Sequence, residues 1–135
     1  MSAFELAAAA EALVGVPFRL HGRDPNCGVD CLGVLAAALA RIGRSASLPA
    51  SHTLRRRGEV DAEAVARDAG LVRAAGVLAR GDMLLVRCSA TQLHLLIAVN
   101  ASRFVHAHAG LGRVVIGARD PGWPVVGHWR LPQTQ

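Results

Sequence analysis

Apolar residues recur in the first half of the chain at the spacing of α-helices. The segments 4–14, 31–42 and 61–69 place apolar positions three or four residues apart, and a glycine directly follows each segment. The middle segment, CLGVLAAALARI, is apolar on nearly every side, which is typical of a buried central helix. Asp30 precedes it and is a natural N-cap, because its carboxylate can accept hydrogen bonds from the free N–H groups of the first turn.

The second half of the chain changes to the pattern of short β-strands. Turn residues such as Gly-Asp and Asp-Pro-Gly bound five expected strands, at 83–88, 93–99, 103–109, 113–118 and 125–131. Helices followed by strands are typical of an α+β fold, with an antiparallel sheet of about five strands packed on the buried helix. The segments 18–29 and 44–60 are expected to be loops.

Size and composition favour one globular domain covering residues 1–135. Hydrophobic residues make up 52% of the chain and charged residues 19%, which is enough apolar material for a single core. No apolar run reaches the ~18 residues of a membrane span, so membrane insertion is not expected. The N-terminus lacks the basic and apolar regions of a signal peptide, and we expect synthesis in the cytoplasm.

The charge of the chain favours an anionic partner without selecting one. The formal net charge is +5, and all 15 basic residues are arginine. Aromatic residues make up only 4%, and no base-stacking motif is present, so a specific nucleic acid is not the expected partner.

The cysteines suggest neither a disulfide framework nor a metal site. Cys27, Cys31 and Cys88 are odd in number and irregularly spaced, and no export signal precedes them. The tight ligand pairs of a structural zinc site are also absent from the sequence. We therefore expect free thiols and no metal or cofactor.

Cys31 is a candidate nucleophile because it begins the expected central helix. Free N–H groups and the helix dipole stabilise a thiolate at such a position and lower its pKa. The alternative is a small residue that merely starts a buried helix. The surrounding string GVDCLG favours the nucleophile, since Gly28 and Gly33 leave room for close approach and Asp30 places a carboxylate beside the sulfur.

Three histidines are candidates for the base and its orienting residue. His94 lies near the start of the apolar strand LHLLIAV, where an imidazole without a partner is costly to bury, although a satisfied core histidine is the alternative. His106 lies in the next expected strand, and a turn near residues 100–101 brings it close to His94. One imidazole can then hold the other in a fixed tautomer. His108 shares a face with His106 and is the other candidate for this role, or lines the cleft.

Five strings of the sequence together match a known pattern. They are GVPFRLHG at 15–22, GVDCLGV at 28–34, GDMLLVR at 81–87, QLHLLIAV at 92–99 and FVHAHAG at 104–110. With these strings the chain resembles the NlpC/P60 family of cysteine peptidases, and more closely its small subgroup of phage and gene-transfer-agent cell-wall peptidases. The matching strings follow the family order of nucleophile, base and orienting residue.

The resemblance implies a fold and a triad. The fold is a circularly permuted papain-like one, in which a helix that begins with the nucleophile packs on an antiparallel sheet. The triad consists of Cys31 as nucleophile, His94 as general base and acid, and His106 as the residue that orients His94.

The resemblance also implies a substrate site, with two departures from the family. Asp30 would engage the free amine of a stem peptide, with Phe18 and His108 beside it. Family members usually carry Tyr at the position of Phe18 and often Ser at that of Leu32. The first departure removes the tyrosine hydroxyl, which in the family is expected to contact the substrate or support the oxyanion.

The implied activity is that of a cysteine endopeptidase of the cell wall. It would cleave an amide bond in peptidoglycan stem peptides, next to a D-amino acid, through an acyl-enzyme. The subgroup implies a place in a phage or gene-transfer-agent particle, with phage-like tail proteins as partners. Two alternatives stand beside this hypothesis: an inactive structural or adaptor tail protein with the same fold, and an acyltransferase of the wider fold.

Overall fold

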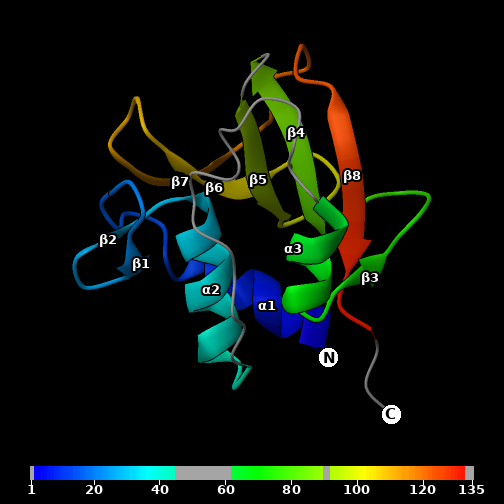
Figure 1. The fold of residues 1–135 in the computed structure, drawn as a ribbon, viewed down its shortest axis with the longest axis horizontal. Helices are drawn as coiled ribbons and strands as arrows, with labels where there is room; N and C mark the ends of the chain where they lie inside the picture. Colours follow the sequence, from blue (N-terminus) through cyan, green and yellow to red (C-terminus); the bar gives the residue numbers. More distant parts are fainter. Residues whose placement is uncertain (1, 45–61, 90–91, 133–135) are drawn as a thin grey trace.

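The structure is a computed structural model that describes residues 2–44, 62–89 and 92–132 (Figure 1). Within these residues the helices are α1 (Ser2–Glu11), α2 (Cys31–Arg41) and α3 (Ala62–Asp68). The predicted helices are thus confirmed, with ends shifted by at most three residues. Almost all of the expected loop at 44–60 lies outside the described residues.

An antiparallel sheet of six strands forms the second half of the domain. Its members are β3 (Val72–Arg73), β4 (Met83–Ser89), β5 (Gln92–Ala98), β6 (Phe104–His108), β7 (Arg113–Gly117) and β8 (Val125–Arg130). Their order in the sheet is β3-β8-β4-β5-β6-β7. All five predicted strands are present. This strand order places β8, the last strand in the sequence, inside the sheet between β3 and β4.

Two predictions about irregular segments were incomplete. The expected loop at 18–29 contains a small antiparallel pair, β1 (Arg23–Asp24) and β2 (Gly28–Val29). The short edge strand β3 was not predicted either, and it pairs Val72 with Arg130 of β8. Strands of two residues are too short to show an alternating pattern, because their backbone pairing, rather than their side chains, defines them.

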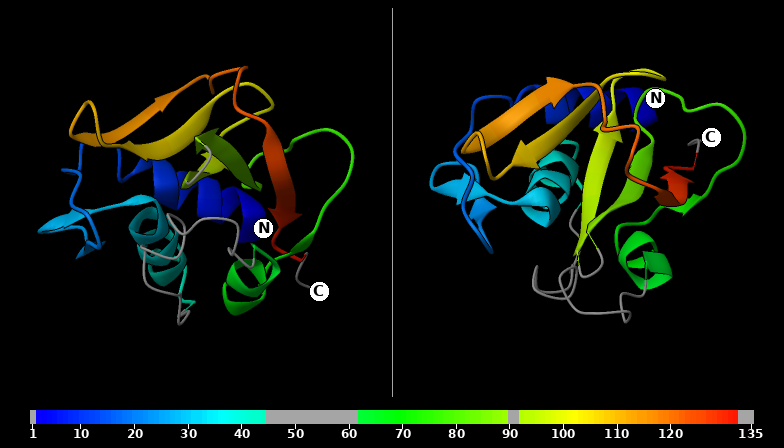
Figure 2. Two further views of the ribbon diagram at one scale, coloured as in Figure 1. Left: turned by 45° about the horizontal axis from the view of Figure 1, so that its top comes forward. Right: turned by 90° about the horizontal axis from the view of Figure 1, so that it is seen from above.

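Helices and sheet enclose the main core between them. In the left view of Figure 2, α1 and α2 lie beneath the sheet. The apolar face of α2 packs against alternate residues of the central strands, among them Leu93, Leu95 and Ile97. A smaller cluster on the other face of the sheet includes Leu84, Leu96 and Phe104. None of the helices in the described residues is both long enough and apolar enough to cross a membrane.

Candidate active site

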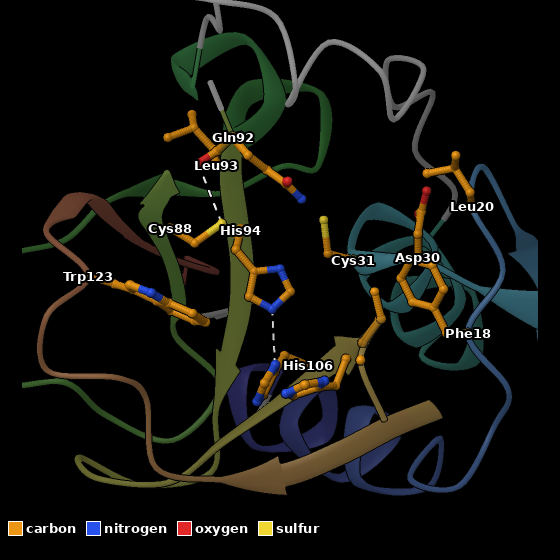
Figure 3. Close-up of a pocket in the computed structure, with 14 residues that line it drawn as sticks. Phe18, Leu20, Asp30, Cys31, Cys88, Gln92, Leu93, His94, His106 and Trp123 are labelled. Carbon is orange, nitrogen blue, oxygen red and sulfur yellow. Dashed lines mark hydrogen bonds between the residues drawn. The ribbon is translucent and has the colours of Figure 1, made fainter. Parts of the chain in front are cut away.

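A pocket of about 230 Å³ opens where the N-terminus of α2 meets β5 and β6 (Figure 3). All six residues predicted for the site line this pocket: Phe18, Asp30, Cys31, His94, His106 and His108. The structure therefore brings together side chains that are separated by up to 90 positions in the sequence. The wall also includes Leu20, Cys88, Gln92, Leu93, Trp123 and the 107–110 segment.

Asp30 fixes the start of α2 and thereby the position of Cys31. Its Oδ1 accepts a hydrogen bond from the backbone N–H of Gly33 at 3.0 Å, which confirms the predicted N-cap. Its Oδ2 accepts another from the backbone N–H of His21 at 2.9 Å, and His21 adopts a positive φ of 63°. Asp30 is 3% exposed. The carboxylate therefore joins the helix to the loop that precedes it, in addition to facing the pocket.

Gly33 permits the close approach that the sequence suggested. A Cβ at this position would overlap the backbone carbonyl oxygen of Gly22. The backbone N–H of Asp30 donates to that same oxygen at 3.3 Å. The loop before α2 is thus held tightly against the first turn of the helix. Phe18, in the same loop, is anchored by its backbone N–H, which donates to the carbonyl oxygen of Gly112 at 2.8 Å.

His94 and His106 form the predicted imidazole pair. The Nε2 atom of His94 lies 3.0 Å from Nδ1 of His106, and the two rings meet edge to face with centroids 5.1 Å apart. The strands that carry them are paired only at Ile97–Val105 and Ala98–Phe104. The hydrogen bond therefore lies beyond the end of that ladder and runs diagonally between the two strands, and it confirms the predicted closeness of the two histidines.

This hydrogen bond limits the proton positions of the triad. Because Nε2 of His94 is engaged with His106, Nδ1 is the nitrogen left for Cys31, which stands on the opposite side of the pocket from His94 (Figure 3). An Nδ1 that accepts a proton requires the neutral tautomer with hydrogen on Nε2. His94 then donates to Nδ1 of His106, and the arrangement suits His94 as a general base.

His108 lies next to His106 but has its own backbone partner. The rings of His106 and His108 have centroids 5.8 Å apart. The backbone N–H of Leu111 donates to Nδ1 of His108 at 3.0 Å, which leaves the proton of the neutral ring on Nε2. Of the two candidates for the orienting position, His106 is the one that makes the hydrogen bond to His94.

The prediction that Cys31 has a lowered pKa was wrong. The pKa of the Cys31 thiol is raised to about 12, mainly by burial and to a smaller extent by the negative charge of Asp30. The backbone N–H groups of Leu95 and Leu32 and the charge of Arg23 act in the opposite direction but are weaker. The cost of desolvating a thiolate thus exceeds the benefit of the helix N-terminus, and the sulfur of the unliganded protein is a neutral thiol.

Both histidines of the pair are neutral for the same reason. The pKa of His94 is lowered to about 3, mainly by burial and to a smaller extent by the positive charges that His106 and His108 would carry. Burial and His108 lower the pKa of His106 to about 4. A neutral thiol therefore faces a neutral imidazole, and a reaction would transfer the proton during attack on a substrate.

Several residues of the pocket were not assigned to it from the sequence, and Trp123 and Gln92 are the polar or aromatic ones nearest to His94 in contact or in sequence. The ring of Trp123 meets the His94 ring edge to face, with centroids 5.9 Å apart. Gln92 was given no role, although it lies two positions before His94 and lines the pocket. The i, i+2 spacing in a strand was the available signal for Gln92. Trp123 follows a turn whose path only the folded chain defines.

The remaining thiols lie outside the proposed triad. No disulfide joins any of the three cysteines. Cys27 is exposed and its Sγ lies 3.7 Å from Oδ2 of Asp24, whereas Cys88 lines the pocket and its Sγ donates to the carbonyl oxygen of Gln92 at 3.6 Å. Within residues 2–44, 62–89 and 92–132, no group of three or more His, Cys, Asp or Glu side chains is arranged to hold a metal ion.

Comparison with known proteins shows the fold. No family model matches the sequence, and no curated protein is significantly similar to it. Among solved structures, NlpC2 from Trichomonas vaginalis matches 99% of this chain with a TM-score of 0.69 at 17% identity. An NLP/P60 family lipoprotein-like protein from Staphylococcus aureus matches 98% with a TM-score of 0.66 at 19% identity.

A third match carries a biochemical name. The peptidoglycan hydrolase RipB from Mycobacterium tuberculosis matches 98% of this chain with a TM-score of 0.60 at 20% identity, over 66% of its own length. The chain spans 47% of NlpC2 and 42% of the staphylococcal protein. These matches show that the chain has the α+β, papain-like fold of NlpC/P60 proteins, as the sequence predicted.

Proposed function

We propose that this protein is a cysteine peptidase that cleaves an amide bond in the stem peptides of peptidoglycan. The observation that carries the proposal is the hydrogen bond between Nε2 of His94 and Nδ1 of His106, in a pocket that also contains Cys31 at the first position of α2. The NlpC/P60 fold and the name of the neighbour RipB support the substrate class.

The mechanism follows from the neutral state of the reacting groups. Sγ of Cys31 attacks the carbonyl carbon while its proton passes to Nδ1 of His94, and the free N–H groups at the start of α2 stabilise the oxyanion. His106 accepts from Nε2 of His94 and stabilises the imidazolium that forms. His94 then gives its proton to the leaving amine. Water, activated by His94, releases the acyl group from the sulfur.

Asp30 is the acidic residue that we assign to substrate binding. It lines the pocket, and each of its oxygens already accepts one backbone N–H. Because a carboxylate oxygen has two lone pairs, each can still accept from a substrate ammonium group. Among the described residues that line the pocket, Asp30 is the acidic one, so a free amine of a stem peptide would bind beside it. Phe18 and His108 would contact the rest of the peptide.

Two parts of the proposal rest on the sequence resemblance alone. They are the choice of a bond next to a D-amino acid and the place of the protein in a phage or gene-transfer-agent particle, with tail proteins as partners. The absence of a tyrosine hydroxyl at Phe18 supports one second candidate, an inactive adaptor with the same fold.

Mass spectrometry of defined muropeptides tests the proposal. The wild-type protein should release stem-peptide fragments, and Cys31→Ala should release none. Cys27→Ala is the matched control, because Cys27 is exposed and lies outside the pocket, and it should retain wild-type turnover. No release by the wild-type protein would favour the adaptor. Transfer of the acyl group to an added amine, in preference to water, would favour an acyltransferase.

A further inference from the structure

The proposed reaction places a negative charge on the carbonyl oxygen, and the pocket needs donors for it. Attack by Sγ of Cys31 forms an S–C bond, moves the carbonyl π electrons to oxygen and sends the thiol proton to His94. Backbone N–H groups at the start of α2 provide one side of an oxyanion site. The ring of Phe18 has no N–H or O–H group, so it cannot provide the other side.

Gln92 is the neutral carboxamide in the pocket wall. It lies on β5 two positions before His94, a spacing that places both side chains on the same face of the strand. Its side chain extends from the end of the strand toward Cys31 (Figure 3). The backbone carbonyl oxygen of Gln92 accepts a hydrogen bond from Sγ of Cys88 at 3.6 Å, which helps to hold this end of β5.

The charge of the site also favours an amide at this position. Asp30 already places one negative charge beside the sulfur, and the imidazoles of His94 and His106 are neutral before the reaction. An amide N–H can stabilise a developing negative charge without adding a full charge to the unliganded pocket. A glutamate of the same length could not donate when ionised, and a methionine of similar length has no donor.

We propose that the Nε2 amide of Gln92 donates a hydrogen bond to the oxyanion formed when Cys31 attacks the substrate. This inference rests on the proposed peptidase function. It makes Gln92 a catalytic residue, since its amide would touch the reacting oxygen. The strand that carries the base would then supply a donor that the ring of Phe18 cannot supply.

Kinetics of Gln92→Met test the proposal. The kcat for a stem tetrapeptide should fall by about 10²–10³-fold with little change in KM, because the lost interaction exists mainly in the transition state. Gln92→Glu should be similarly impaired. Gln92→Asn, which keeps an amide on a shorter side chain, should recover part of the activity. A kcat of Gln92→Met within threefold of wild type would overturn the proposal.

Two reactions of Cys31 distinguish oxyanion binding from a structural role. Alkylation by iodoacetamide forms no oxyanion, so its rate at Cys31 should be the same within about twofold in wild type and Gln92→Met. N-acetyl-D-alaninal forms a hemithioacetal on the sulfur, and its protection of Cys31 from alkylation should weaken about tenfold in Gln92→Met. Slower alkylation matching the loss of kcat would show that Gln92 only positions the thiol, and would overturn the proposal.

The aldehyde experiment also separates this inference from the proposed function. If the wild-type protein cleaves the tetrapeptide but aldehyde protection is equal in both proteins, the Gln92 assignment alone is wrong. If the wild-type protein cleaves no peptide, the proposed function fails. Equal aldehyde protection would overturn the Gln92 assignment in that case also, and weaker protection in Gln92→Met would support it.

Discussion

Loss of hydration is the main influence on the reacting side chains at the scale of single residues. It raises the pKa of Cys31 to about 12 and lowers that of His94 to about 3. Each shift favours the neutral form. In the unliganded site these pKa values favour a neutral thiol and a neutral imidazole over a thiolate–imidazolium pair.

The pH dependence of alkylation checks this assignment. Far below the pKa of a thiol the thiolate fraction rises about tenfold per pH unit, so the rate of iodoacetamide with Cys31 should keep rising from pH 6 to pH 9. Peptide mapping of the adducts measures this rate, with the exposed Cys27 as the reference in the same sample. A plateau at Cys31 between pH 5 and pH 8 would instead indicate a preformed ion pair.

The members of the triad should contribute unequally to turnover. Cys31→Ala and His94→Ala should both reach background, because nucleophile and base act as one unit. His106→Ala removes the acceptor of the 3.0 Å hydrogen bond but leaves the base, so it should keep roughly 10⁻² to 10⁻⁴ of wild-type kcat. Steady-state kinetics on a stem tetrapeptide measure these values. Near-full activity of His94→Ala would rule out its role as base.

Much of the site could be predicted at this scale, and the reasons for the errors are physical. The position of Cys31 after an N-capping aspartate and the spacing of His94 and His106 are local features, and the structure confirms the cap and the contact. The pKa of Cys31 depends on how much solvent the folded neighbours exclude. The position of Trp123 depends on the path of a turn between two strands, and no local pattern fixes either property.

At the scale of elements, a buried carboxylate joins the ends of β4 and β8. Asp82 is 0% exposed and accepts hydrogen bonds from Nε2 of His128 at 2.6 Å, Nε of Arg130 at 2.7 Å and the backbone N–H of Ala79 at 2.8 Å. Burial raises the pKa of Asp82, but these hydrogen bonds outweigh it and hold the pKa below its ordinary value. His128 therefore makes a polar contact as well as packing the last strand.

Removal of this charge should destabilise the sheet. Asp82→Asn leaves Arg130 and His128 without their carboxylate. Because the side chain of Arg130 is 37% exposed and can be hydrated, the loss in the free energy of unfolding should be about 1–3 kcal/mol, below that of a fully buried pair. Glu63→Gln is the control, because the Glu63–Arg73 pair is exposed and should contribute no more than about 1 kcal/mol. Urea denaturation at pH 7 measures both variants. Equal losses would show that burial of Asp82 adds nothing.

The elements themselves were predictable where their side chains repeat. The apolar period identified the segment of α2 and the five longer strands, because each presents a regular apolar face to the core. β3 was not predicted, because backbone pairing with β8 defines it and its two residues show no side-chain pattern. The pair β1–β2 is likewise defined by backbone contacts, within a segment whose glycine and proline content indicates only turns.

At the scale of the whole molecule, the neutral histidines make stability depend on pH. The folded protein holds the pKa of His94 near 3 and that of His106 near 4, whereas an unfolded histidine titrates near 6.5. The unfolded state thus binds more protons over this interval. The stabilising contribution is complete above about pH 6.5 and is lost as the pH falls toward 4.

Denaturation at several pH values tests this linkage. The free energy of unfolding should decrease between pH 6.5 and pH 4.5, with a slope of at most about 1.4 kcal/mol per pH unit for each histidine. His94→Gln should show a smaller slope than the wild-type protein, because one of the two groups no longer titrates. A free energy of unfolding that is independent of pH over this range in the wild-type protein would contradict the assignment.

The place of β8 inside the sheet has a consequence for the order in which the chain can fold during synthesis. The helix that carries the sulfur is synthesised early, the histidines follow about sixty residues later, and the strand that sits between β3 and β4 comes last. Pairings so distant in sequence form slowly. During refolding, peptidase activity should therefore return no sooner than the amides of β8 become protected from hydrogen exchange. Activity that returns before this protection would contradict the expected folding order. The nascent chain therefore contains Cys31 well before the strands that carry the two histidines and the strand β8 have been synthesised.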